Sequence, residues 1–258
     1  MNSNEEIDID GGSMTLSDAA CHILNTASAE RKAHSTRNVA QSWQDGTLGE
    51  IGTSKPPDRP ARPARPELTP PRNVKRRRIS EHPAGRIALL HALAHIELNA
   101  IDLAWDIVAR FGGQPELPRA FFDDWVAVAD DEAKHFLLLS QRLADLEASY
   151  GDLPAHDGLW QAAHATADDL LARLAVVPLV LEARGLDVTP AMIVKLNAAK
   201  DHDSAAVLQT IHDDEIGHVA VGRRWFDFLC ARRQLEPATT YQSLVRRYFR
   251  GAVKAPFN

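Results

Sequence analysis

The 258-residue sequence has the composition of an ordinary globular protein, with 45% apolar and 25% charged residues. Its net charge of −6 argues against a chain that binds nucleic acid over its whole surface. The sequence lacks the run of about 18 uncharged apolar residues that a membrane helix needs. The acidic N-terminus MNSNEEIDID does not resemble a secretory signal. Only two cysteines are present, Cys21 and Cys230, which excludes a disulfide framework, so we expect a cytoplasmic protein.

Five segments make up the predicted organisation of the chain. Residues 1–14 are expected to form a disordered tail. Residues 15–54 are predicted to be an N-terminal helical appendage, because their apolar residues recur with helical spacing. Residues 55–82 are an extended Pro/Arg-rich arm, residues 83–235 a helical bundle, and residues 236–258 a C-terminal helix and tail.

The arm differs from the rest of the chain in both proline content and charge. Between Lys55 and Arg78 it holds seven of the fifteen prolines and a charge of +7, which leaves −13 for the remainder. Proline forbids helix and favours polyproline geometry. Two interpretations are open: the arm lies across its own acidic bundle, or it contacts a phosphate-bearing partner such as RNA. The candidate contacts for an anionic partner are Arg59, Arg62, Arg65, Arg76, Arg77 and Arg78.

Helical patterns dominate the rest of the sequence, and no β-alternation of any length occurs. We predict helices at 84–111, 118–149, 158–184, 190–200, 203–233 and 241–249. Gly112-Gly113 marks the end of the first of these helices. Pro178 is predicted to kink the third helix, and Gly185 to end it. The fold class is therefore all-α.

Two of these helices carry the same Glu-x-x-His motif. It reads DEAKH from Asp131 to His135 and DEIGH from Asp214 to His218. Residues three apart lie on one helix face, so each glutamate can share a metal ion with its histidine. Single glutamates also occur in two apolar helical stretches, HIELNAIDLAW and PLVLEARG, where an unpaired carboxylate would be costly. The predicted metal ligands are Glu97, Glu132, His135, Glu182, Glu215 and His218.

The spacing of these ligands repeats along the chain. Glu97 and Glu132 are 35 residues apart, and Glu182 and Glu215 are 33 apart. In antiparallel helix pairs, this spacing brings both carboxylates to the same height. Two such pairs predict a dinuclear site inside a ferritin-like four-helix bundle, with an extended link near 150–160 crossing between the halves. Glu132 and Glu215 are the expected bridges between the two metal ions.

Other polar residues near the motifs are predicted to support the ligands. Asp131 and Asp214 could accept the second N–H group of a ligating histidine. His212 lies one turn before Glu215 and could act in the same way. His91 and His95 are interpreted as structural or as outer neighbours, because the helical spacing puts His95 on a different face from Glu97.

Several stretches of the chain together resemble a bacterial ferritin-like family of unknown function. These are HALAHIELNAIDLAWD, DDWVAVADDEAKHF, YGDLPAHDGLW, RLAVVPLVLEARGLDVTP and DDEIGHVAVGRRWF, together with the arm sequence DRPARPARPEL and the C-terminal KAPFN. The resemblance covers most of the chain and implies the same fold and the same six ligands. It implies no substrate.

From these observations we expect a di-iron enzyme that uses O₂ to oxidise or hydroxylate an unidentified substrate. The substrate is a small molecule or an RNA, and tRNA is the RNA expected if the arm binds nucleic acid. Two Fe ions are the expected cofactors, with Mn or mixed Mn/Fe as alternatives. An external electron donor and a homodimer are further expectations, and no membrane partner is expected. The alternative functions are iron or manganese handling, peroxide detoxification, and a metal-stabilised helical scaffold without turnover.

Overall fold

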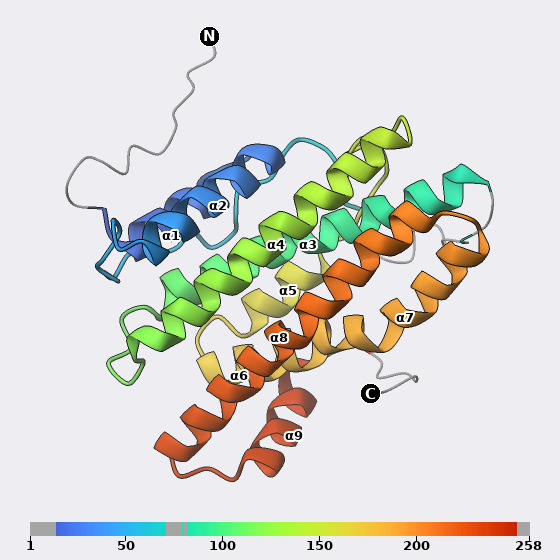
Figure 1. Ribbon diagram of the computed structural model, residues 1–258. Helices are drawn as coiled ribbons and strands as arrows, with labels where there is room; N and C mark the ends of the chain where they lie inside the picture. Colours follow the sequence, from blue (N-terminus) through green and yellow to red (C-terminus); the bar gives the residue numbers. More distant parts are fainter. Residues whose placement is uncertain (1–13, 71–78, 80–81, 252–258) are drawn as a thin grey trace. The chain divides into compact units, whose positions relative to one another are not determined.

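A computed structural model describes residues 14–70, 79 and 82–251 of the chain. The prediction of an all-α protein is confirmed for these residues, since each of their named elements is a helix (Figure 1). In chain order the helices are α1 (Leu16–Asn25), α2 (Ala29–Gln44), α3 (Pro83–Phe111), α4 (Arg119–Asp145), α5 (Gly158–Ala165), α6 (Leu170–Val176), the π-helix η2 (Val177–Glu182), α7 (Ala183–Ala198), α8 (His202–Arg232) and α9 (Pro237–Tyr248). The predicted N-terminal tail lies outside the described residues, apart from Met14.

The chain divides into two compact units. One comprises residues 1–64 and 97–137, and the other comprises residues 65–96 and 138–258. Helices α3 and α4 each contribute residues to both units. The units are described separately below.

In the first unit, α1 and α2 pack against the parts of α3 and α4 that belong to it. Thr15 begins α1 with a capping box, exchanging hydrogen bonds with Asp18. The indole Nε1 of Trp43 on α2 donates to Asp123 of α4 at 2.9 Å. The indole of Trp105 on α3 donates to Thr36 of α2 at 3.0 Å. The two N-terminal helices therefore share a core with α3 and α4.

A buried ion-pair network also joins α2, the arm and α3 in this unit. Lys32 pairs with Asp102, and both side chains are almost fully buried. Arg62 of the arm reaches the same Asp102 at 3.0 Å and also donates to Asn99 at 2.7 Å. Burial lowers the pKa of Lys32 from its usual value, although Asp102 counteracts the shift. The network fixes this part of the arm to α3.

In the second unit, Asp201 connects three helices. Its carboxylate accepts from the backbone N–H of Ser204 and so caps the start of α8. The same carboxylate pairs with Arg86 of α3 at 2.8 Å and with Arg142 of α4 at 2.9 Å. These contacts hold the N-terminal end of α8 against α3 and α4.

The region predicted as one kinked helix at 158–184 is built differently. It consists of α5 and α6, followed by η2, which continues without interruption into α7. The prediction that Gly185 ends the helix is wrong, and Pro190 lies inside α7 and not at a helix start. The irregularity falls instead at Pro178, which lacks an N–H donor and lies in the π-helical segment. Within α7 the cost of one glycine and one proline is outweighed by packing on α8.

Helix α3 is long and apolar enough to cross a membrane by length and composition alone. However, 72% of its most apolar window is buried inside the protein. Burial of this kind is typical of a core helix, so the apolar character of α3 is weak evidence for a membrane span.

Candidate metal centre

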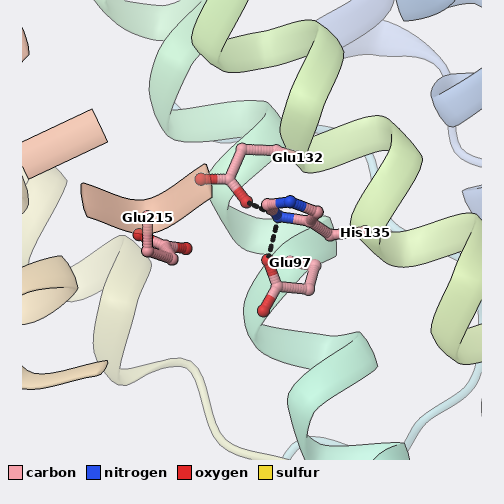
Figure 2. Close-up of side chains that lie close together, drawn as sticks. All are labelled: Glu97, Glu132, His135 and Glu215. Atoms are coloured by element: carbon pink, nitrogen blue, oxygen red, sulfur yellow. Dashed lines mark ion pairs between the residues drawn. The ribbon is translucent and has the colours of Figure 1, made fainter. Parts of the chain in front are cut away.

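Three of the six predicted ligands come together in the first unit. Glu97 lies on α3, and Glu132 and His135 lie one turn apart on α4. The Nδ1 atom of His135 is 3.4 Å from a carboxylate oxygen of Glu97 and 3.5 Å from one of Glu132 (Figure 2). One ligand atom from each of the three residues lies within 4.8 Å of the others. The Glu-x-x-His motif on α4 therefore directs both of its side chains toward the glutamate of α3.

Their burial makes this cluster electrostatically unusual. Glu97 is 3% exposed, and Glu132 and His135 are fully buried. Burial, followed by the charge of Glu132, raises the pKa of Glu97 well above its ordinary value. Burial alone would lower the pKa of His135, but the hydrogen bonds and charges of Glu132 and Glu97 raise it to about 11. The two carboxylates, which repel each other, therefore favour the protonated form of the imidazole that lies between them.

The donor set of this cluster fits a divalent metal ion. Two carboxylates and one imidazole are the ligand types preferred by iron, manganese and zinc. A cation bound at Nδ1 of His135 would replace the proton and neutralise the repulsion between Glu97 and Glu132.

The other three predicted ligands belong to the second unit. Glu215, also labelled in Figure 2, lies on α8. Its carboxylate is 3.6 Å from Nδ1 of His218, which is buried. This repeats the geometry of the motif on α4. Glu182 is the last residue of η2, and η2 packs against α8.

The π-helical segment that carries Glu182 is held by two specific contacts. Gly222 of α8 lies so close to Pro178 that a Cβ atom added there would be 2.4 Å from the Cβ of the proline. The hydroxyl of Tyr241 on α9 donates to the backbone carbonyl of Leu179 at 3.1 Å. π-Helical turns inside longer helices occur frequently at functional sites. Sequence reasoning predicted a kink at Pro178 but missed these partners, which come from helices far along the chain.

Two of the three residues predicted to support the ligands contact side chains other than the predicted ligands. Asp131 forms an ion pair with Lys134 on its own helix. His212 lies 3.5 Å from the carboxylate of Asp213. Asp214 is half-buried on α8. The supporting roles of Asp131, Asp214 and His212 stay predictions.

His91 and His95 take part in a structural network in the second unit. The backbone N–H groups of Gly151 and Leu153 both donate to Nε2 of His91, at 2.9 and 3.4 Å. One ring nitrogen of His95 is 2.9 Å from the Tyr150 hydroxyl, and the other is 3.0 Å from the carbonyl of residue 156. Both histidines therefore anchor the loop after α4, in agreement with their interpretation as structural residues.

The arm residues predicted to contact an anionic partner are in different situations. Arg62 contacts Asp102 and Asn99 of α3, in agreement with the interpretation that the arm lies across its own bundle. Arg59 and Arg65 have exposed side chains. Arg76, Arg77 and Arg78 lie outside the described residues.

Comparison with known proteins identifies relatives of this chain. A family model described as "Protein of unknown function (DUF455)" matches residues 25–258, a range that includes all six predicted ligands. A protein of Haemophilus influenzae described as an uncharacterized protein is 43% identical over 196 residues, which cover 73% of this chain and 68% of that protein. No solved structure matches the chain.

Proposed function

The chain belongs to the DUF455 family, and we propose that it is a ferritin-like carboxylate protein that uses a dinuclear metal centre to oxidise an organic substrate. The observation that carries this proposal is the buried cluster of Glu97, Glu132 and His135. Burying two carboxylates beside one imidazole is costly in a protein without a ligand for them, and that cost is typical of functional sites.

The repetition of the motif supports a second metal position. Glu215 and His218 reproduce on α8 the separation found between Glu132 and His135 on α4. Glu182 ends a π-helical turn, whose altered backbone can direct a side chain out of the regular helical register. We propose that each motif, with one further glutamate, holds one metal ion, and that Glu132 and Glu215 bridge the pair.

The chemistry of O₂ activation would be supplied by two bound iron ions. The protein would bind them through the six ligands and exclude bulk water by the burial of Glu97, Glu132 and His135. Glu97 would serve as a charged ligand there, and a bound cation would offset the burial and the repulsion from Glu132 that raise its pKa in the metal-free protein. The apolar residues around the cluster would keep the effective dielectric low and strengthen these electrostatic effects.

The metal content of the purified protein tests the proposal. We expect about two iron ions per chain in the wild type and a loss of metal in the Glu132→Ala, Glu215→Ala double variant. The matched control is Glu30→Ala, which removes an exposed glutamate on α2 and should leave metal content unchanged. Iron in the wild type should be followed by O₂ consumption with candidate substrates.

Other results of the same measurement would favour other functions. Two manganese ions would place metal handling or peroxide detoxification ahead of oxygenation. Metal that stabilises the fold but supports no turnover with any oxidant would indicate a scaffold. A wild-type protein that binds no metal even after anaerobic loading with iron would refute the proposal.

A further inference from the structure

A cavity of about 480 Å³ lies in the second unit, between η2, the C-terminal part of α8 and the start of α9. Its apolar lining includes Leu179 of η2, Phe226 of α8 and Tyr241 of α9. The rings of Phe226 and Tyr241 meet edge to face, with centroids 6.1 Å apart. The cavity can therefore accept an apolar body about the size of an aromatic ring against an aromatic wall.

The polar lining of the cavity favours a hydrogen-bond donor. Asp227 accepts at one carboxylate oxygen from Nε of Arg223 at 2.6 Å, while its other oxygen, Oδ1, is buried without a hydrogen-bond partner. Glu236 adds a second carboxylate at the cavity, where it also caps α9. Two carboxylates against the single guanidinium of Arg223 give the lining a net charge of −1. A lining with an excess of carboxylate favours a ligand with a cationic donor.

We propose that this cavity is a binding site for a small organic amine with a ring-sized apolar body. The ammonium group would pair with the carboxylate of Asp227, whose side chain lines the cavity, and the apolar body would pack between Leu179, Phe226 and Tyr241. The assignment is independent of the metal centre, because none of the nine lining residues is a predicted metal ligand.

Calorimetric titration with 2-phenylethylamine tests the site, with 3-phenylpropionate as a probe of similar size and opposite charge. We expect the wild type to bind the amine and to bind the carboxylate at least about tenfold more weakly. Asp227→Asn preserves the shape of the side chain but removes its charge, so it should weaken amine binding about tenfold. Ala238→Trp should fill the cavity and abolish binding.

A tryptophan on the outer surface of the same helix provides the control. Ser243→Trp places the same side chain at an exposed position of α9 that does not line the cavity, so binding should be unchanged. Circular dichroism melting checks that all variants fold. The proposal would be overturned if the wild type failed to bind the amine, if the carboxylate bound equally well, or if a folded Ala238→Trp protein still bound the amine.

Discussion

At the residue scale, the buried charge of Glu97 is unfavourable for the stability of the metal-free protein but is needed to bind a metal ion. Its carboxylate is buried 3.4 Å from His135 and beside Glu132, and burial together with the charge of Glu132 raises its pKa. A neutral side chain of the same shape would remove this repulsion. The same change would remove a charged metal ligand.

Glu97→Gln should therefore have opposite effects on the metal-free and metal-loaded protein. We expect the metal-free variant to be more stable by about 1 kcal/mol, since a strained buried charge is lost. Iron affinity should fall at least about tenfold. Thermal melting with chelator and with added Fe²⁺ measures both effects. A variant that is less stable without metal and unchanged in affinity would show that Glu97 has a purely structural role.

Asp201 is the residue for which pH dependence can be predicted. Burial would raise its pKa, but hydrogen bonds from Ser204, Arg142 and Arg86 outweigh that effect and lower the pKa below its ordinary value. A carboxylate with a lowered folded-state pKa contributes stability above its unfolded pKa of about 3.9, and this contribution is lost as the pH falls through the folded pKa.

Asp201→Asn should cost about 1–2 kcal/mol at neutral pH, because it removes the buried carboxylate that pairs with both Arg86 and Arg142, while Arg142 keeps its ion pairs with Asp145 and Asp203. Asparagine can still cap α8, so the loss reports mainly on the ion pairs. The difference from wild type should shrink below about pH 4. Urea denaturation at several pH values measures it. Asp203→Asn, at an 84% exposed side chain nearby, should have little effect.

At the element scale, the position of the π-helical segment depends on a close contact between η2 and α8. Gly222→Ala would place a methyl group 2.4 Å from Cβ and 2.6 Å from Cγ of Pro178, so η2 must shift. We expect a loss of about 1–3 kcal/mol in stability and weaker metal binding through the displaced Glu182. Metal titration with melting curves measures both.

The control for this change lies five residues earlier on the same helix. Gly217 has open space at its Cβ position, so Gly217→Ala should leave metal binding intact and stabilise α8 by up to about 1 kcal/mol. If Gly222→Ala bound metal as well as Gly217→Ala does, the contact with Pro178 would not control the position of Glu182.

The arm allows its two proposed roles to be separated by mutation. Arg62→Ala should destabilise the protein by about 1–3 kcal/mol, because Arg62 is one of the two cations, with Lys32, that pair with the buried Asp102. Arg59→Ala with Arg65→Ala, at exposed side chains, should leave stability unchanged. If the arm binds RNA, the double variant should weaken tRNA binding and lower its salt slope by about 2. Filter binding at several salt concentrations measures the affinity for tRNA. If the wild-type protein does not bind tRNA at low salt, the hypothesis of an RNA substrate is excluded.

Features of the fold that depend on local sequence could be predicted, whereas features that depend on contacts between distant segments could not. The Gly112-Gly113 stop and the long apolar periodicity located α3 within one residue, since these are local features. The separation of 35 residues between Glu97 and Glu132, on helices expected to be antiparallel, predicted that Glu97 approaches the motif that contains His135. The π-helical turn and the continuation of α7 through Gly185 and Pro190 could not be predicted in this way, since they depend on α8 and α9 packing against that segment.

At the scale of the whole molecule, the proposed dinuclear centre needs ligands from two separate stretches of the chain. Glu97, Glu132 and His135 come from α3 and α4, and Glu182, Glu215 and His218 come from η2 and α8. If Glu132 and Glu215 bridge the ions, each half of the ligand set also contributes to binding the other ion. Two independent mononuclear sites would behave differently.

Single histidine variants distinguish these arrangements. With bridging, both His135→Ala and His218→Ala should lower metal content well below one ion per chain, because both ions together position the bridging carboxylates, so losing one ion weakens binding of the other. Independent sites would each keep one ion. Bound metal stabilises the folded state by mass action, so the rise in melting temperature on adding Fe²⁺ should disappear in both variants. A variant that keeps one ion and about half of that rise would replace the dinuclear proposal with two separate sites.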